Sequence, residues 1–346
     1  MSRPGPTGGR PLRTEVRDPE LVEAFVAYFE LADRHGAATH ARAQLRAGRP
    51  ADEIRDAVGR AQRRVGELWQ SGRWTITQEH AATAVAEAVL ASLDDHLGDV
   101  AAVGRVAIAA ADGEWHALPA RLAEHAFACV GLDTVFLGAG LPATDVARTL
   151  PALGVDALAV SVTMPSNLTG AARTVAAGHS AGLPVLLGGG ASSVSRARAL
   201  GADAHAPSVE AGTQTVLGWI RHRTRPTGIA RLRDAEADGL RRARTRLLSE
   251  AVTAVEDGVA AAGTDAAIDQ TVEDLEQLYD HLAAAVLVDD PAVFTDVVPW
   301  LADVHRGRRL PTTLLALELG ALESVLADHP AARSLVRDGR HGGVTG

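Results

Sequence analysis

A carboxylate and a histidine stand two residues apart just after a short apolar run at 106–111. Glu114 can accept a hydrogen bond from one imidazole nitrogen of His116, which leaves the other nitrogen free to bind a metal ion. Trp115 lies between them. A histidine in a loop is more often structural than a metal ligand, so the assignment depends on the residues that accompany it.

Two later apolar runs end in hydroxyl groups and in glycines. Ser161 and Thr163 lie at the end of the run at 157–162, and Gly188 and Gly189 belong to the end of the run at 184–190. In an open parallel sheet, ligands bind beyond the carboxyl ends of the strands. Glycines there let a bulky ligand lie against the backbone. The sequence therefore predicts a deep slot with His116 at its mouth.

This set resembles the cobalamin-binding domain of the methionine synthase and mutase type. The family pattern is Asp/Glu-x-His-x-x-Gly, then Ser-x-Leu/Thr, then Gly-Gly, and this chain departs from it at Pro119, which stands in the place of the first glycine. The resemblance implies that His116 is the lower axial cobalt ligand and that Glu114 orients it. It also implies that the nucleotide tail of a base-off cobalamin is lined by Ser161, Thr163, Gly188 and Gly189.

A second motif precedes the sheet, with Trp69 followed after nine residues by Glu79 and His80. One interpretation is ordinary: the tryptophan closes a helix, and Thr77 caps a next helix whose first turn exposes the two polar residues. The motif also resembles the cap of adenosylcobalamin photoreceptors known from bacterial repressors of carotenoid genes. That resemblance implies that Trp69, Glu79 and His80 surround the adenosyl group.

Two departures from those repressors affect the expected output. A histidine that directly follows the tryptophan can bind cobalt there after illumination, whereas this chain has Gln70 at that position. The repressors also begin with a helix-turn-helix domain, which has no counterpart here. We therefore expect an output other than direct binding to DNA.

Polar and aromatic residues gather again near the carboxyl terminus, where the stretch 285–310 looks similar to the globin-like bilin-binding domain of photocobilins. A tetrapyrrole needs arginines for its propionates and an Asp or His near its pyrrole nitrogens. Because Cys129 is the only cysteine, a biliverdin would be held without a covalent bond. Heme bound by His281 or His305 is the competing tetrapyrrole, and a cofactor-free signalling bundle is the plain alternative. The candidate contacts are His281, Asp296, His305 and Arg306.

The elements that must position these residues follow from the apolar periodicity. Four helices are expected before residue 98, with breaks at Gly36, at 48–50 and at 71–72. Five short apolar runs then alternate with helix-length segments, which predicts a five-stranded, doubly wound, flavodoxin-like parallel sheet. We expect a disordered tail (1–17), a four-helix cap over the upper corrin face (18–98), a cobalamin-binding domain (99–221) and an all-helical, globin-like sensor domain (222–340).

The composition excludes several functional classes. All 34 basic residues are arginines, so chemistry that needs an ε-amine, such as Schiff-base or phosphate-loop catalysis, is absent. The single cysteine, expected to be a small buried residue, excludes a disulfide framework and fits a reducing cytoplasm. A net charge of −9 argues against a nucleic-acid partner, and no segment is apolar enough for a membrane span.

We therefore expect a cytoplasmic photoreceptor and not an enzyme. Light would break the cobalt–carbon bond of adenosylcobalamin, and the released cap would signal to a second copy of the chain or to a downstream protein. The alternative is a corrinoid methyl carrier that works with methyltransferases. Those carriers place an apolar cap over a methyl group, so the cap residues distinguish the two. A small subunit of an adenosylcobalamin mutase is a third possibility.

Overall fold

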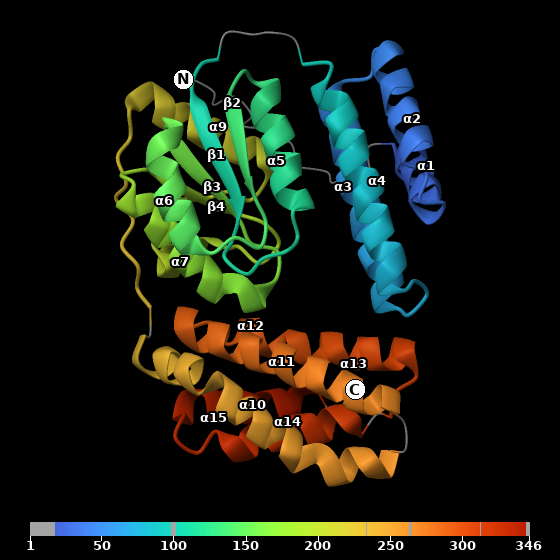
Figure 1. Cartoon of the computed structure of the whole chain (residues 1–346), viewed down its shortest axis with the longest axis vertical. Helices are drawn as coiled ribbons and strands as arrows, with labels where there is room; N and C mark the ends of the chain where they lie inside the picture. Colours follow the sequence, from blue (N-terminus) through green and yellow to red (C-terminus); the bar gives the residue numbers. More distant parts are fainter. Residues whose placement is uncertain (1–17, 98–101, 233, 263–264, 312, 344–346) are drawn as a thin grey trace, which may run out of the picture.

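The computed structural model describes residues 18–97, 102–232, 234–262, 265–311 and 313–343. The tail expected at 1–17 lies outside these residues. The described chain forms an amino-terminal helical cap, a five-stranded parallel sheet flanked by helices, and a carboxyl-terminal helical region. The cap stands beside the sheet, and the carboxyl-terminal helices lie below both (Figure 1). This architecture confirms the predicted fold class.

The cap consists of α1 (Pro19–Glu30), α2 (Arg34–Arg46), α3 (Ala51–Gln70) and α4 (Ile76–Asp94). Their apolar faces enclose one core that includes Phe25, Phe29 and Ile54. The break expected at Gly36 is wrong, because Gly36 lies inside α2. The chain turns earlier, and the Asp33 side chain caps α2 by accepting a hydrogen bond of 2.8 Å from the Gly36 N–H.

The turn from α3 to α4 separates the two parts of the cap motif. Trp69 belongs to the last turn of α3, and Glu79 and His80 lie in the first turns of α4. Thr77 does not cap this helix. Thr75 does, through a capping box in which its hydroxyl accepts from the Gln78 N–H at 3.3 Å and the Gln78 side chain accepts from the Thr75 N–H at 2.8 Å.

The sheet has the strand order β2-β1-β3-β4-β5, and every pair of neighbours is parallel. The direction of winding therefore changes between β1 and β3, which makes their carboxyl ends the switch point where such folds bind ligands. The strands are β1 (Arg105–Ala110), β2 (Asp133–Gly138), β3 (Ala157–Ser161), β4 (Val185–Gly188) and β5 (Ala204–His205).

Helices cover both faces of the sheet, which explains why the strands are almost continuously apolar. Val106 and Ile108 of β1 face a core shared with α5 (Leu118–Cys129) and α9 (Val209–His222). Ala107 and Ala109 face the opposite core, which is covered by α6 (Ala143–Leu153), α7 (Leu168–Ser180) and α8 (Val194–Leu200).

The cap is joined to this domain by polar pairs that each have one buried and one more exposed partner. Arg55 of α3 donates to Glu210 of α9 at 3.1 Å, and His125 of α5 pairs with Asp94 of α4 at 2.7 Å. Cys129, expected to be buried, is exposed. It lies in the last turn of α5, where its side chain points away from the core and its Sγ lies 3.4 Å from His125 Nε2.

The carboxyl-terminal region packs against the carboxyl edge of the sheet. The short helix η1 (Pro165–Asn167) after β3 contacts α11, and Arg196 of α8 pairs with Asp290 at 2.8 Å. No helix in the described ranges is long and apolar enough to cross a membrane. The helices of this region are α10 (Asp234–Ala262), α11 (Asp265–Val288), α12 (Ala292–Thr295), α13 (Val297–Arg308), α14 (Leu314–Val325) and α15 (Pro330–Gly343).

Candidate functional site

The loop between β1 and α5 holds the predicted ligand in a fixed orientation. His116 Nδ1 lies 2.5 Å from Glu114 Oε1, and the same oxygen accepts the His116 backbone N–H at 3.1 Å. The imidazole is thus fixed through its Nδ1 side, which is the arrangement that presents Nε2 to a metal ion. Nε2 has no hydrogen-bond partner among the described residues, and the His116 side chain is half exposed.

Glu114 is the fixed point of this loop. It is fully buried, and its second oxygen accepts the backbone N–H groups of Thr163 at 2.8 Å and Met164 at 2.9 Å. The carboxylate therefore ties the loop after β1 to the loop after β3. Burial alone would raise its pKa, but the hydrogen bonds from His116 and from the Met164 N–H lower the pKa of Glu114 to about 2.

The charge of Glu114 also acts on the histidine. Its hydrogen bond raises the pKa of His116 against the opposing effect of burial, and the charge of Glu79 adds to the rise. Since Glu79 belongs to the cap, the first turn of α4 lies near enough to the His116 loop for this charge to act on the imidazole.

Two buried hydroxyl groups at the end of β3 lack partners. Ser161 Oγ and Thr163 Oγ1 are both inaccessible to solvent, and neither makes a hydrogen bond within the described residues. Ser161 is paired in register with Gly188 of β4 and with Ala110 of β1. Buried hydroxyls are normally hydrogen-bonded, so these two suit the polar groups of a bound ligand. They fit the nucleotide tail of a cobalamin.

The glycines beside them meet two different requirements. Gly189 has φ +96°, and a Cβ there would lie 2.3 Å from the Val162 carbonyl oxygen, so the backbone itself requires glycine. A Cβ on Gly188 would meet only the Ala206 Cβ at 3.7 Å. Gly188 thus leaves open space at the end of β4, next to the unpartnered Ser161 hydroxyl. The free Nε2 of His116, the two unpartnered hydroxyls and the open space at Gly188 together fit the predicted cofactor.

Trp115 projects outward between the two motif residues. Its side chain is 78% exposed, and its ring lies over Gly140, where a Cβ would approach it to 2.8 Å. The Gly140 N–H donates to the Glu114 carbonyl at 2.8 Å. Trp115 is therefore placed at the rim of the site and not in the protein core.

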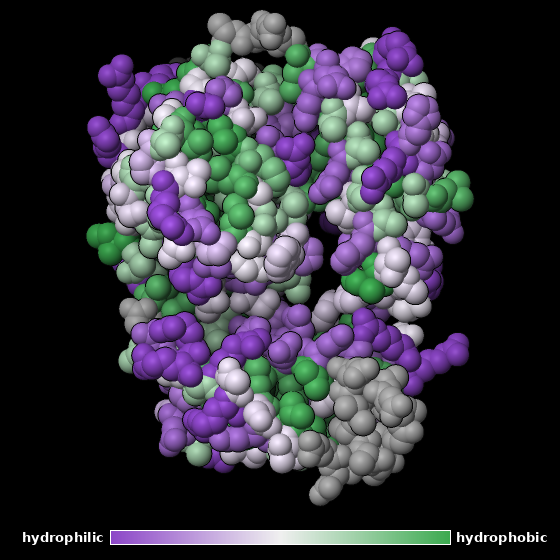
Figure 2. All heavy atoms as spheres, viewed as in Figure 1, coloured by the Kyte–Doolittle hydropathy of each residue, from purple (hydrophilic) through white to green (hydrophobic). Residues whose placement is uncertain are grey.

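The cap residues have unequal environments. Glu79 is only partly exposed and accepts hydrogen bonds from Gln62 and Thr83, each at 3.1 Å. His80 is largely exposed, and its Nδ1 lies 2.6 Å from the other Glu79 oxygen. Figure 2 shows a hollow between the cap and the sheet domain, above the carboxyl-terminal helices. This is the space that a cofactor held by both motifs would enter.

Trp69 contacts the carboxyl-terminal helices, which the sequence motif did not predict. Its ring lies 5.9 Å from that of Trp300 in α13, centroid to centroid, and the Arg308 guanidinium lies 5.4 Å from the Trp69 ring centroid. Close by, a Cβ on Gly72 would lie 2.4 Å from the Gly307 carbonyl oxygen. The end of α13 therefore touches the turn between α3 and α4 directly.

The four residues predicted near the carboxyl terminus do not gather in one place. His281 is buried in α11, where its Nδ1 bonds the Gln277 carbonyl at 2.7 Å and burial lowers its pKa. Asp296 is exposed, and Arg306 is exposed and paired with Asp303 at 2.8 Å. His305 is buried within the helices. Exposed and buried positions thus alternate where a common pocket was expected.

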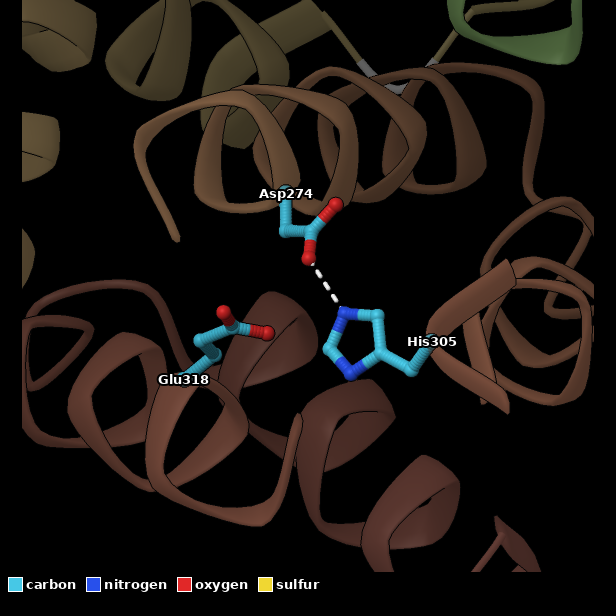
Figure 3. Close-up of side chains that lie close together, drawn as sticks. All are labelled: Asp274, His305 and Glu318. Atoms are coloured by element: carbon cyan, nitrogen blue, oxygen red, sulfur yellow. Dashed lines mark hydrogen bonds and ion pairs between the residues drawn. The ribbon is translucent and has the colours of Figure 1, made fainter. Parts of the chain in front are cut away.

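Two buried acids near His305 were missed by the sequence analysis. His305 Nε2 lies 2.5 Å from Asp274 Oδ2, and Glu318 points toward the same spot from α14 (Figure 3). Burial and the charge of Asp274 raise the pKa of Glu318 to about 9. A single acidic residue in the apolar run of α14, LLALELGAL, was the signal available in the sequence.

Comparisons with known proteins agree with this geometry. Residues 104–216 match a family model described as B12 binding domain, and residues 22–94 match a second model with the same description. The sheet and the cap are therefore B12-binding domains, and the resemblance to cobalamin-binding proteins is confirmed at that level. No curated protein sequence matches the chain.

Three solved structures are similar to this chain, and one of them, a corrinoid protein, shares the fold at a TM-score above 0.5. The monomethylamine corrinoid protein of Methanosarcina barkeri is 18% identical, with a TM-score of 0.51 over 57% of this chain and 98% of that one. A cobalamin-binding protein from Desulfitobacterium hafniense DCB-2 is 20% identical over 57% and 98%, with a TM-score of 0.32. The methanol:cobalamin methyltransferase complex MtaBC from Methanosarcina barkeri is 17% identical over 59% and 81%, also with a TM-score of 0.32.

Proposed function

We propose that the B12-binding domains of this chain hold adenosylcobalamin and act as a light-responsive switch. The observation that carries the proposal is the contact of Trp69, in the cap, with Trp300 and Arg308 of the carboxyl-terminal helices. A residue that would meet the upper ligand of the cofactor is thereby connected to a separate helical region. A switch requires such a connection, whereas simple storage of a cofactor does not.

The residues that would hold the cofactor lie at the carboxyl ends of β1 and β3. His116 would bind cobalt through Nε2, and Glu114 would keep the imidazole in place. Ser161 and Thr163 would give their unpartnered hydroxyls to the nucleotide tail. When bound, adenosylcobalamin supplies a cobalt–carbon bond that light can break. The protein contributes the enclosure and the response.

The cap would provide the response. Glu79 and His80 form a polar pair suited to the ribose and adenine of the adenosyl group, and Trp69 offers an aromatic surface at the end of α3. Loss of the adenosyl group would remove a packing partner of Trp69, which would keep its contact with Trp300. Trp69 would then pack mainly against α13. A partner protein or a second copy of the chain would detect this change in packing. Gln70 does not supply an imidazole for the vacated face.

The carboxyl-terminal helices would add a second chromophore in this proposal. A biliverdin there would be held without a covalent bond, because the chain has no cysteine after Cys129. Co-expression with an enzyme that makes biliverdin should then give absorbance in the far red. A preparation that stays without that absorbance would leave the region as a signalling bundle.

We also propose a cytoplasmic location, consistent with a free, exposed cysteine.

The alternative function is a corrinoid methyl carrier. The polar pair of Glu79 and His80 distinguishes the two, because a methyl group needs neither a hydrogen-bond donor nor an acceptor above the corrin. The test is uptake of adenosylcobalamin and of methylcobalamin by cofactor-free protein, with spectra recorded in the dark and under green light. The switch predicts preference for adenosylcobalamin and a lasting spectral change on illumination. Preference for methylcobalamin with no light response would support the carrier.

A further inference from the structure

Three side chains from three helices meet inside the carboxyl-terminal region. Asp274 comes from α11, His305 from α13 and Glu318 from α14, and their polar ends point toward one another (Figure 3). One imidazole nitrogen and one oxygen from each acid lie within 4.8 Å of each other. The three residues are 1%, 3% and 0% exposed, respectively. None belongs to the cobalamin motifs.

The Glu318 carboxylate is the unusual member. Neither of its oxygens makes a hydrogen bond of normal geometry within the described residues, and His305 Nδ1 also lacks a partner there. Buried leucines from its own helix, Leu314, Leu315 and Leu322, share its surroundings. Burying an acid without a partner is unfavourable, so such groups are normally paired or bound to a metal.

We propose that Asp274, His305 and Glu318 bind a divalent first-row transition-metal ion such as Zn²⁺. One imidazole nitrogen with two carboxylate oxygens is a ligand set that Zn²⁺, Mn²⁺ and Fe²⁺ accept. Ligand atoms about 2.1 Å from one ion lie at most about 4.2 Å apart, so a small movement of these side chains completes the set. A dication also balances two buried carboxylates that no arginine contacts within the described residues.

The surrounding residues hold the ligands as outer-shell groups do in metal sites. The Gln270 side-chain N–H donates to Asp274 Oδ1 at 2.7 Å, which leaves Oδ2 facing His305. Arg308 donates to the side-chain amide oxygen of Gln270, and the same guanidinium lies over the Trp69 ring. The metal site is thus linked through two side chains to the cap, although its existence does not depend on the proposed light response.

The test uses the full chain, free of cobalamin and of any histidine tag, treated with a chelator and then titrated with Zn²⁺. Calorimetry and metal analysis should give one tightly bound ion per chain, with a rise in the melting temperature. Glu318→Gln, which keeps the shape and removes the charge, should weaken binding about 100-fold. Glu276→Gln, on α11 and 52% side-chain exposed, is the matched control and should bind as the wild type does.

A spectroscopic variant of the experiment identifies the ligands. Co²⁺ added to the cobalamin-free chain should give absorption bands that disappear in Glu318→Gln and in His305→Gln. Absence of one-to-one Zn²⁺ binding to the wild type would overturn the proposal. Equal binding to Glu318→Gln would also overturn it. So would a heme Soret band that depends on His305, because heme and the proposed ion need the same imidazole.

Discussion

Trp69 of α3 stacks on Trp300 of α13 with ring centroids 5.9 Å apart and an interplanar angle of 34°. This pair joins the cap to the carboxyl-terminal helices. The Arg308 guanidinium extends the contact on the Trp69 ring. The relationship gives the cap a physical connection to a region that no cobalamin motif includes.

Trp300→Ala should interrupt this connection without removing the cofactor. Loss of a partly buried aromatic partner is expected to lower the free energy of unfolding by about 1–2 kcal/mol. Cobalamin absorbance should stay as in the wild type, while the light-dependent change in hydrogen exchange of α13 should disappear. Trp300→Phe keeps an aromatic ring and should keep the response. If the alanine variant responds to light as strongly as the wild type, Trp69 does not signal through Trp300.

Glu114→Gln should damage both the fold and the site. The carboxylate accepts the Thr163 and Met164 N–H groups and fixes His116, and an amide cannot accept all of these hydrogen bonds. We expect a loss of about 2–3 kcal/mol in unfolding free energy and a 10- to 100-fold loss in cobalamin affinity. Chemical denaturation and spectrophotometric titration measure the two effects. Glu67→Gln, at an exposed cap position, is the control.

Thr163→Val should separate binding from stability. The Thr163 hydroxyl is buried without a partner, so replacing it with a methyl group of the same shape should leave the cofactor-free protein as stable or slightly more stable. Cobalamin affinity should fall about 10-fold if the tail uses this hydroxyl. Thr174→Val removes a hydroxyl that accepts from Asp112 N–H at 3.0 Å, and it should destabilise the cofactor-free protein. Unchanged affinity in Thr163→Val would place the tail elsewhere.

The His125–Asp94 pair should make stability depend on alkaline pH. Burial opposes the charged form of His125, but hydrogen bonds to Asp94 and Cys129 raise its pKa from 6.5 to about 9. A raised folded-state pKa stabilises the fold fully below pH 6.5, and this stabilisation disappears as the pH rises through about 9. The contribution is about 3 kcal/mol.

Denaturation between pH 6 and 10 tests this contribution. His125→Gln should flatten the profile and remove most of the difference between the two ends of the range. His35→Gln, at an exposed position in α2, should keep the wild-type profile. A wild-type profile in the His125 variant would show that the pair does not join α4 to α5 energetically.

The sheet and the His116 loop could be predicted because their signals are local. Near-continuous apolar runs define buried parallel strands, and Glu114 is near enough to His116 in sequence for their hydrogen bond to be foreseen. The start of α2 was misplaced because the Asp33 cap depends on one side-chain contact. Cys129 was expected to be buried because its neighbours in sequence are small and apolar. That composition does not show which face of α5 the side chain occupies.

Contacts between distant segments could not be read in the same way. The Trp69–Trp300 stack joins residues on helices of different regions, and nothing in their local sequence pairs them. Asp274 and Glu318 are likewise brought to His305 only by the packing of α11, α13 and α14. The exposed positions of Asp296 and Arg306 follow from the face each occupies, which charge content alone does not indicate.

In the proposed function, His116 binds the cobalt of a base-off cobalamin, and one measurement tests this ligation most directly. The chain and its His116→Ala variant are loaded with adenosylcobalamin in the dark, and their absorption spectra are compared before and after green light. We predict a histidine-on spectrum for the wild type that changes on illumination, and a spectrum without histidine ligation for the variant. Identical dark spectra for both proteins would show that His116 does not bind the cobalt.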